Sequence, residues 1–367
     1  MEFWSARRMQ FCDTDCKSAL RRRICLVILS LVLWAGFSRA SEPALQRFQF
    51  THPAMGTLFS ITCYAENTNQ AYAATTLAFK RIDVLEDIMS DYQADSELML
   101  LCEKPPGQPV PVSADLFVVL QRAQKVSEIS GGAFDVTVGP YVRLWRFARK
   151  KKVLPMETEL RAAAPAVGFR KLRLDKQART VTLLVPNMRL DLGGIAKGFA
   201  ADEALEVLKG RGVNRALVAA SGDIAIGEPP PGKKGWTVGI SSIDAHDNET
   251  TTNVMLANAG ISTSGDTEQF IEIGGRRYSH IIDPTTGLGL TNRIQATVIA
   301  RDATTTDAMA TTVCVLGPKR GIAAIEKTPH AAALILTKDD VRHETLISPR
   351  FRQFLPKTTE TPIQPEP

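Results

Sequence analysis

Three long stretches of the chain repeat apolar residues at the spacing of an amphipathic helix. They are residues 68–92 (TNQAYAATTLAFKRIDVLEDIMSDY), 113–130 (SADLFVVLQRAQKVSEIS) and 195–212 (IAKGFAADEALEVLKGRG). Apolar side chains that recur every three or four positions form one face of a helix. Ser113 is a typical N-cap and Gly131 a typical stop for the second stretch. The pattern therefore predicts three helices over these ranges.

Shorter runs alternate polar and apolar residues or are apolar throughout, as strands do. Residues 57–65 (TLFSITCYA) alternate, and residues 270–281 (FIEIGGRRYSHI) read as a hairpin turned by Gly274-Gly275. Further runs of this kind are LRLD, TVTLLV, RALVAAS, WTVGI and NVMLANAGIST, all within residues 172–263. Because strands and helices cluster and do not alternate regularly, the chain predicts an α+β fold of layered mixed or antiparallel sheets with flanking helices.

Near the C-terminal end, residues 304–312 (TTTDAMATT) predict a helix with a narrow polar face. Asp307 and Thr311 are four residues apart, which places them about 40° apart around a helix. Ala310 and Cys314 share this face, and larger apolar residues cover the opposite one. The small neighbours would allow a ligand to approach the carboxylate closely.

The first forty residues have the pattern of a secretory signal. Arg21–Arg23 precede the apolar run Ile24–Phe37, and Ser38–Ala40 place small residues at the two positions that a signal peptidase reads. The run is short for a transmembrane span, and an uncleaved anchor is the alternative. We expect export to the periplasm or to the periplasmic face of the inner membrane. The expected parts are a signal peptide over 1–40, one domain over 41–355 and a disordered tail over 356–367.

Charge and cysteine content narrow the function classes. The net charge of the 367 residues is +5, but residues 1–40 hold seven bases and three acids, so the rest is nearly neutral. No basic surface that would bind nucleic acid is expected. The stretch RKKKVL from Arg149 predicts a solvated surface loop. Outside the leader, Cys63, Cys102 and Cys314 are too few and too widely spaced for a disulfide framework or a zinc site.

Residues 189–202 (RLDLGGIAKGFAAD) have the outline of an anion site. A strand ends at Asp191, two glycines open a helix, and Lys197 stands in its first turn. Helix N-termini attract anions, and glycine lets the backbone approach a ligand closely. The stretch matches neither common nucleotide-binding fingerprint, so a tight turn with a surface lysine is the alternative.

Two further stretches carry possible chemistry. In SGGAFDVTVGP, the Phe134 ring could stack on a heterocycle and the Asp135 carboxylate could hydrogen-bond to it. The alternative is structural: the glycines cap a helix and Phe134 packs in the core. In YSHIIDPTTG, His280 could act as a general base near Asp283, or it could be structural. No serine-hydrolase motif is present.

The carboxylate and hydroxyl of Asp307 and Thr311 suit a hard cation such as Mg²⁺. An Asp–Thr pair on a helix surface is the alternative, and the HExxH and paired-cysteine zinc patterns are absent. Taken together, a phosphate cradle, an aromatic–acid pair, a base and an oxygen-ligand metal site predict phosphoryl-type transfer from a nucleotide-like cofactor.

In this order, the motifs resemble those of the ApbE family of FAD:protein FMN transferases. They run from HPAMGTLFSI at His52 through SGGAFDVTVGPYVRLWRF, DLGGIAKGFAAD, SGDIAIG, STSGD and YSHIIDPTTG to ATTTDAMATTVCVLG. The resemblance covers about residues 48–354 and implies a T-fold-like architecture. It implies an exported, Mg²⁺-dependent enzyme that splits FAD, releases AMP and attaches FMN to a Thr or Ser of a target flavoprotein. The expected acceptor is a membrane respiratory or redox protein.

The resemblance also implies roles for single residues. The implied metal ligands are the side chains of Asp307 and Thr311 and the backbone carbonyls of Gly194 and Ala310. Positions that match FAD contacts are Met55, Tyr92, Ala133, Phe134, Asp135, Asp191, Lys197, His280 and Ile281. His280 matches the residue implied to act in transfer, with Asp307 as the second catalytic residue.

Three departures and two alternatives accompany the resemblance. Here GLGL follows the histidine motif in place of G-x-P, T-D-A replaces A-D-A, and SGD at Ser221 replaces GGD. None removes an implied ligand. One alternative function is a periplasmic FAD pyrophosphatase, in which water replaces the acceptor hydroxyl. The other is a non-catalytic flavin carrier or assembly factor.

Overall fold

The structure is a computed structural model that describes residues 44–243, 249–265, 270–338 and 343–355. The expected leader and tail lie outside these ranges. The largest element is an antiparallel eight-stranded sheet in the order β1-β2-β6-β7-β10-β13-β14-β15. Its strands are β1 (Gln46–Ala54), β2 (Thr57–Ala65), β6 (Ala216–Ala220), β7 (Asp223–Ile226), β10 (Ala259–Gly265), β13 (Arg293–Ala300), β14 (Ala332–Lys338) and β15 (His343–Ile347).

Three smaller antiparallel sheets complete the strand content of the described residues. They are β3 (Val110–Pro111) with β5 (Thr180–Leu183) and β4 (Leu172–Asp175), β8 (Trp236–Ile243) with β9 (Glu249–Leu256), and β11 (Phe270–Ile273) with β12 (Arg276–Ser279). Gly274 and Gly275 turn the last hairpin with positive φ, as the sequence predicted.

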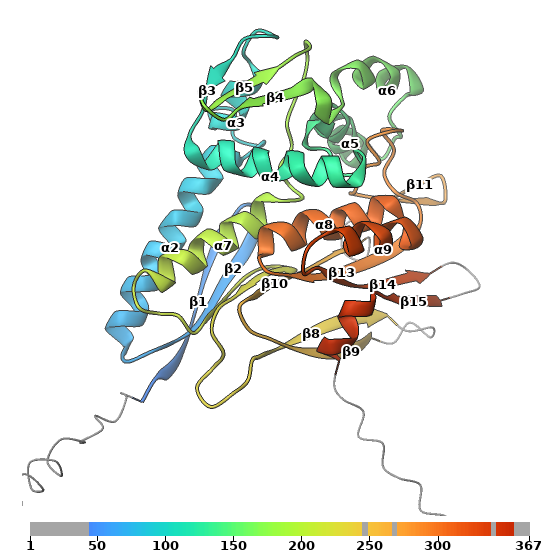
Figure 1. Ribbon diagram of the computed structural model, residues 1–367. Helices are drawn as coiled ribbons and strands as arrows, with labels where there is room; N and C mark the ends of the chain where they lie inside the picture. The colour runs from blue at the N-terminus through green and yellow to red at the C-terminus, as the bar shows by residue number, and fades with distance from the viewer. Residues whose placement is uncertain (1–43, 244–248, 266–269, 339–342, 356–367) are drawn as a thin grey trace, which may run out of the picture. The chain divides into compact units, whose positions relative to one another are not determined.

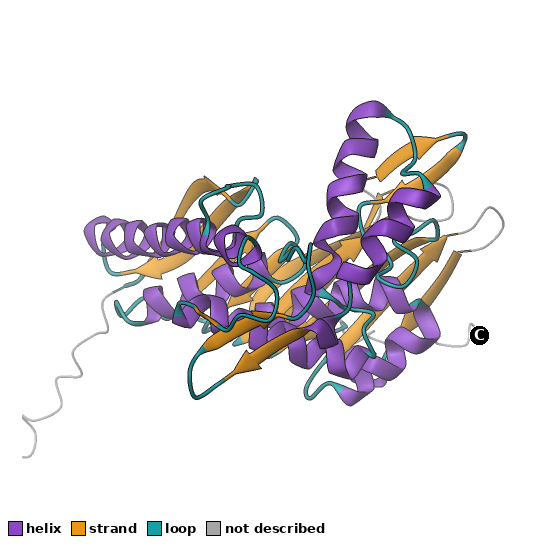
Figure 2. Cartoon of the chain, turned by 90° about the horizontal axis from the view of Figure 1, so that it is seen from above, coloured by secondary structure: helices purple, strands orange, loops and turns teal. Residues whose placement is uncertain are grey.

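Helices α2 (Thr68–Met89), α7 (Ala196–Lys209), α8 (Ala303–Leu316) and α9 (Pro318–Lys327) pack on one face of the large sheet, and the β8–β9 hairpin covers the other (Figure 1). Helices α3 (Glu97–Cys102), α4 (Ala114–Ser130), α5 (Gly139–Lys151) and α6 (Glu157–Ala163) lie beyond them on the same side (Figures 1 and 2). The 3-10 turns are η1 (Val136–Val138), η2 (Ala164–Ala166), η3 (Phe169–Lys171) and η4 (Pro349–Phe354). This arrangement confirms the predicted α+β architecture.

The two faces of the sheet have separate cores because successive side chains of a strand point to opposite sides. On β13, Val298 belongs to the core beneath the helices, whereas Ile299 belongs to the core under β8 and β9. Trp236 and Phe351 are buried in that second core. None of the described helices is long and apolar enough to cross a bilayer.

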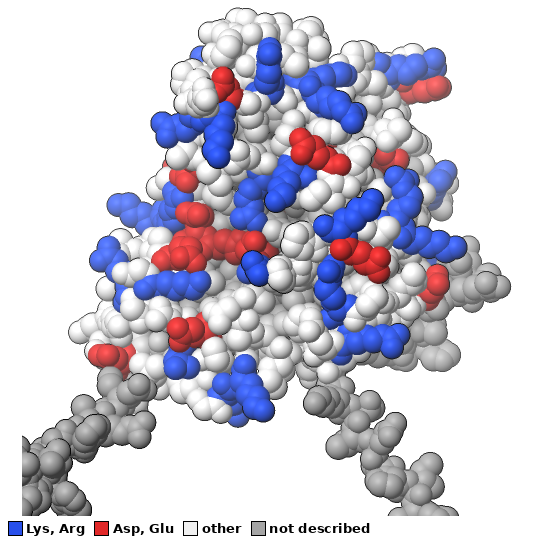
Figure 3. Space-filling view, in the orientation of Figure 1, with Lys and Arg blue, Asp and Glu red and all other residues white. Residues whose placement is uncertain are grey.

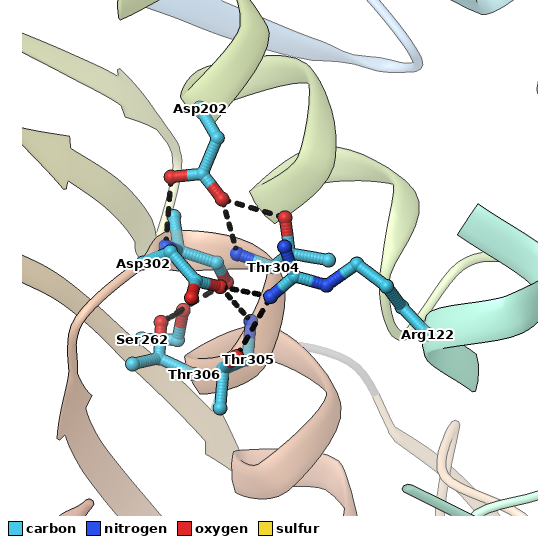
Figure 4. Close-up of polar contacts among 8 residues, drawn as sticks. Arg122, Asp202, Ser262, Asp302, Thr304, Thr305 and Thr306 are labelled. Atoms are coloured by element: carbon cyan, nitrogen blue, oxygen red, sulfur yellow. Dashed lines mark hydrogen bonds and ion pairs between the residues drawn. The ribbon is translucent and has the colours of Figure 1, made fainter. Parts of the chain in front are cut away.

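The N-terminus of α8 is held by two carboxylates (Figure 4). Asp302 is the N-cap and accepts a hydrogen bond from the Thr305 N–H at 2.8 Å. Asp202 of α7 accepts from the N–H groups of Ala303 and Thr304, both at 2.8 Å, and from the Thr304 hydroxyl at 2.5 Å. Burial raises the pKa of Asp202 to about 6. The capping bonds satisfy N–H groups that a helix start leaves unpaired.

Two more contacts join this helix start to α4 and to the sheet. Arg122 of α4 donates to Asp302 and, at 2.8 Å, to the Thr305 hydroxyl. The hydroxyls of Ser262 on β10 and Thr306 lie 2.7 Å apart and share a hydrogen bond. As a result, α8 is fixed against three neighbouring elements (Figure 4).

Helices α7 and α8 approach so closely that only glycine fits at the crossing. A Cβ at Gly198 would lie 2.2 Å from the Ala303 carbonyl oxygen and 2.9 Å from the Asp307 Cβ. This close approach brings the residue before Gly198, Lys197, beside α8.

Three element predictions were wrong in part. The first helix ends at Met89 and not at residue 92, because Ser90 has an extended backbone. The run NVMLANAGIST is two strands, divided at Asn258, whose φ is +49°. The basic stretch from Arg149 is not a loop at its start, since α5 continues to Lys151 and ends where Lys152 takes a left-handed conformation.

Candidate active site

A cavity of about 1200 Å³ opens beside α8, α5 and the start of α7. The β1–β2 turn, the end of α2 and the residues after it, the start of β7, strand β8, the end of β10 and the segments after α4 and β12 also line it. Of the predicted site residues it collects Met55, Tyr92, Ala133, Phe134, Asp135, Asp191, Gly194, Lys197, His280, Ile281, Asp307 and Thr311. Residues separated by up to 256 positions in the sequence therefore share one cavity.

Ala310 is the one predicted site residue that does not line the cavity. Ala310 is fully buried in α8, on the turn that separates Asp307 from Thr311. Its carbonyl remains a predicted ligand. Helix α8 is buried on nearly all sides. The expected polar face is therefore a narrow strip of the helix that borders the cavity.

Lys197, Asp223 and Asp307 form a charge cluster, called here the buried cluster because its two carboxylates are buried, while the Lys197 side chain is 29% exposed. Lys197 stands in the first turn of α7, as predicted, and its Nζ donates to Asp223 at the start of β7. The same Nζ lies 3.9 Å from Asp307 Oδ2, which also accepts from the Gly198 N–H at 3.0 Å. The carboxylate side chains are only 4% and 3% exposed. The cluster holds two acids and one base, so its formal charge is negative.

The cluster shifts the pKa values of its members. Burial, reinforced by the charge of Asp223, raises the pKa of Asp307 to about 7, and Lys197 opposes the shift. Burial alone would lower the pKa of Lys197, but the two carboxylates outweigh it and raise that pKa above its ordinary value. Lys197 is therefore protonated at neutral pH. A further cation beside Asp307 would stabilise the ionised form of this carboxylate.

Oxygen atoms gather next to this cluster. The Thr311 and Ser264 hydroxyls lie 3.5 Å apart. A Cβ at Gly194 would lie 3.2 Å from the Thr311 hydroxyl and 3.3 Å from the Phe134 ring, so the backbone passes close to both. Nowhere in the described ranges do three His, Cys, Asp or Glu side chains gather as a metal cluster would require. An oxygen-rich site beside an uncompensated buried carboxylate fits Mg²⁺ and does not fit zinc.

A second group, the outer cluster, consists of Asp91, Tyr92, Arg146 and Asp191. Arg146 of α5 donates to Asp91, and its guanidinium lies 3.6 Å from Asp191 and 3.9 Å above the Tyr92 ring. Tyr92 is 79% exposed. Burial and the charge of Asp191 raise the pKa of Asp91 to about 6, against the effect of Arg146. The cluster presents an aromatic face and a cation toward the cavity.

The Phe134–Asp135 pair is built into the fold. Asp135 accepts from the Thr137 N–H and hydroxyl at 2.8 and 2.6 Å, and from the Phe169 N–H at 2.7 Å. Gly131 caps α4 in a left-handed conformation, and Phe134 is buried. The glycine cap and the buried Phe134 thus match the structural alternative given above. The predicted contacts of both side chains with the flavin remain predictions.

His280 lies on the cavity wall just after β12 and is exposed. Ile281 beside it is buried, and its N–H donates to the Ser279 hydroxyl at 3.1 Å. Asp283 accepts from the Thr285 N–H at 2.8 Å and so organises the following turn. The histidine is accessible to a molecule entering the cavity, while its neighbours fix the backbone.

The comparison with protein families settles the relationship of this chain. Residues 55–335 match the model described as the ApbE family, which covers every site residue named above. The chain belongs to the ApbE family. A Vibrio cholerae protein named FAD:protein FMN transferase is 31% identical over 337 residues, which cover 90% of this chain and 98% of that protein. A protein of the same name from Escherichia coli K12 is 31% identical over 284 residues, or 75% of this chain and 80% of that one.

Solved structures of ApbE proteins have the same fold. The flavin transferase ApbE from Vibrio cholerae superposes with a TM-score of 0.78 at 30% identity, covering 85% of this chain and all of that one. The ApbE protein from Thermotoga maritima gives a TM-score of 0.76 at 28% identity, with 85% and 100% covered.

Sequence reasoning missed four residues of this ApbE cavity as site members: Asp91, Arg146, Asp223 and Ser264. Asp223 and Ser264 lie in the SGD and STSGD motifs, which carried the resemblance but received no role. Asp91 immediately precedes Tyr92. Arg146 lies in the motif SGGAFDVTVGPYVRLWRF, which also carried the resemblance without giving it a role, and in α5, a helix that the sequence analysis did not predict.

Proposed function

We propose that this ApbE protein is an FAD:protein FMN transferase that cleaves FAD, attaches FMN to a Thr or Ser of an acceptor flavoprotein and releases AMP. The names of its relatives support this activity. The observation that carries it is the single cavity in which an accessible histidine, a helix start with Lys197 and an oxygen-rich site around Asp307 meet. Its volume of about 1200 Å³ exceeds that of typical pockets for drug-sized ligands, which suits a dinucleotide.

The start of α7 would bind the diphosphate of FAD. The backbone at Gly193-Gly194 and the positive end of the helix attract anions, and Lys197 adds a full charge. Arg146 and Tyr92 would hold an aromatic ring of the cofactor at the outer cluster. Phe134 supports the backbone of Gly194 from the core.

Asp307 and Thr311, with the carbonyls of Gly194 and Ala310, would hold Mg²⁺. A bound Mg²⁺ supplies positive charge that stabilises phosphoryl oxygens during transfer. The fit rests on the donor set and on the negative formal charge of the buried cluster. Binding of a cation there would also lower the pKa of Asp307 below its value of about 7 in the cation-free protein.

His280 would act as the general base. It takes the proton from the acceptor hydroxyl, whose oxygen attacks the phosphorus of the FMN half. The bond from that phosphorus to the AMP phosphate breaks, and AMP leaves with the electron pair. His280 suits this role because it lies on the accessible wall of the cavity and not in the core.

We further propose that the chain is exported and that a signal peptidase cleaves it after Ala40. A mature N-terminus at Ser41 in the protein isolated from the periplasm is the expected result. An N-terminus at Met1 would contradict cleavage.

The transfer activity is tested by incubating the protein with FAD, Mg²⁺ and an acceptor flavoprotein domain. AMP release should require the acceptor hydroxyl, so an acceptor with Thr→Val at its modification site is the matched control. Equal AMP release with both acceptors would mean that water is the nucleophile and that the protein is a pyrophosphatase. FAD binding with no AMP release would indicate a carrier.

A further inference from the structure

Helix α5 presents two of its faces to the protein itself. Tyr141, Trp145 and Ala148 are buried in a small core of their own. Arg146 and Arg149 line the cavity. At about 100° per residue these two sets occupy adjoining thirds of the helix circumference.

The third face of α5 is exposed and continues into the residues after the helix. We call it the α5 patch. Its members are Arg143, Phe147, Lys150, Lys151, Lys152, Val153, Leu154 and Met156, all exposed. Phe147, Val153 and Met156 are 61%, 61% and 60% exposed, which is high for large apolar side chains. Four exposed apolar residues within ten positions, interleaved with lysines, exceed the scattered apolar residues of an ordinary surface.

The cations of the α5 patch lack acidic partners among the described residues. The nearby acids are already engaged: Glu157 pairs with Arg161 at 2.8 Å, and Glu159 accepts from the Met156 N–H at 2.8 Å. Acids on the face shown in Figure 3 gather over α2 and α7, away from α5. The patch is thus positively charged and apolar at once.

We propose that the α5 patch docks the protein on an anionic lipid bilayer. Lysines beside exposed Phe, Leu and Met side chains are typical of interfacial membrane binding, in which apolar groups enter the headgroup region and ammonium groups meet lipid phosphates. Protein–protein interfaces are depleted in lysine, and three of the eight patch residues are lysines. Charge complementarity therefore favours a lipid surface over a protein partner.

Docking through this patch would hold the cavity next to the bilayer, because Arg146 and Arg149 of the same helix line the cavity. A membrane-bound acceptor could then reach His280 without the enzyme leaving the surface. This inference does not depend on the transfer chemistry, since it concerns a surface outside the cavity.

The test is co-sedimentation with vesicles of phosphatidylcholine alone or mixed with phosphatidylglycerol. The protein should begin at Ser41, which removes the apolar leader but keeps every residue of the three described cores, and the full chain should be run in parallel. Lys150→Gln with Lys151→Gln should weaken binding to the anionic vesicles by about thirtyfold, and Phe147→Ser with Leu154→Ser should also weaken it. The matched control is Lys233→Gln with Lys234→Gln, which removes two adjacent exposed lysines in the loop before β8.

The control should bind like the unmodified protein, and high salt should release all forms except those held by the leader. Equal binding to both kinds of vesicle, or unchanged binding of the Lys150/Lys151 variant, would overturn the proposal. So would a rise in KM for a soluble acceptor without vesicles, which would identify the patch as a protein-docking surface. All variants should melt at the temperature of the unmodified protein, since the altered side chains are exposed.

Discussion

The buried cluster and the outer cluster of the cavity both join an acid pair to one base, but they do so in different surroundings. Asp223 and Asp307 are almost fully buried around Lys197, on elements packed so closely that Gly198 admits no side chain. Arg146 contacts both Asp91 and Asp191, and its guanidinium lies over the ring of Tyr92, which is largely exposed. The two bases are about equally exposed, but the carboxylates of the first cluster are almost fully buried, whereas those of the second are 17% and 15% exposed and lie beside an open aromatic ring.

The difference separates two tasks. Charges act most strongly where water is excluded, so a preorganised buried cluster suits the stabilisation of a transition state. Exposed cation–ring contacts contribute modestly and suit ligand positioning. We therefore expect changes in the buried cluster to reduce turnover, and changes in the outer cluster to reduce affinity.

The largest effect is expected from Asp307→Ala, which should abolish Mg²⁺-dependent transfer, a loss of more than about 10⁴-fold, through loss of the cation site. Asp307→Asn, which keeps the volume, should lose a similar factor because the charge is what matters. The fold should survive, since Lys197 retains Asp223 as its partner. Steady-state transfer at limiting Mg²⁺ and a thermal melt measure both properties. Full transfer by Asp307→Ala under these conditions would show that this carboxylate does not hold the metal.

His280→Ala should reduce transfer by about 10²–10⁴-fold, the usual contribution of a positioned base. FAD affinity should change by no more than about 1 kcal/mol, the worth of one hydrogen bond. Fluorescence titration of FAD and in-gel fluorescence of the flavinylated acceptor measure the two effects separately. Wild-type transfer by this variant would rule out His280 as the base.

Replacing Lys197 should lower the free energy of unfolding more than replacing Asp307 does. Lys197→Met leaves Asp223 and Asp307 buried without a counter-charge, and breaking a buried pair in this way costs about 3–5 kcal/mol. Asp307→Ala leaves a balanced pair and should cost much less. Urea unfolding of both variants in Mg²⁺-free buffer makes the comparison. If Asp307→Ala is the less stable variant, the charge balance proposed for the cluster is wrong.

In the outer cluster, Arg146→Gln or Tyr92→Leu should raise the KM for FAD by about twofold to fivefold, with kcat nearly unchanged, since exposed cation–π contacts contribute roughly 0.5–1 kcal/mol. Initial rates at varied FAD concentration separate the two parameters. A lower kcat with an unchanged KM would show that the outer cluster acts in the chemical step and not in binding FAD.

A further effect concerns the pH dependence of stability. Asp91 has a pKa of about 6 when folded, against an ordinary value of 3.8, so the folded state holds a proton that the unfolded state releases. The unfolded state then binds fewer protons in this window, and the free energy of unfolding should fall as pH rises from about 4 to about 6. Asp91→Asn should flatten that part of the curve in urea unfolding series. An unchanged slope would mean that other groups, such as Asp202, cause it.

The same contrast shows how far the sequence can predict this molecule. Lys197, Gly194, Asp307 and Thr311 lie in short motifs whose local pattern predicted the elements that carry them, and all four line the cavity. The partner of Lys197 was not predicted, because Asp223 reaches it only through the pairing of β7 within the sheet.

The outer cluster was the part that could not be predicted. It depends on α5, whose cavity-facing Arg146 lies in a run that begins at Gly139-Pro140 and ends in four consecutive cations. The run of cations favoured a loop at the C-terminal end of α5. The helix is instead stabilised by the tertiary packing of Tyr141 and Trp145, which a local pattern does not reveal. The strands β13 and β14 were missed for a similar reason, because strands buried on both faces lack alternation.

The most direct test of the central claim is the intact mass of an acceptor domain after incubation with the protein, FAD and Mg²⁺. The account predicts an acceptor heavier by one FMN unit, joined through a phosphoester to a Thr or Ser, with one AMP released for each acceptor modified. An acceptor of unchanged mass beside free FMN and AMP would contradict it.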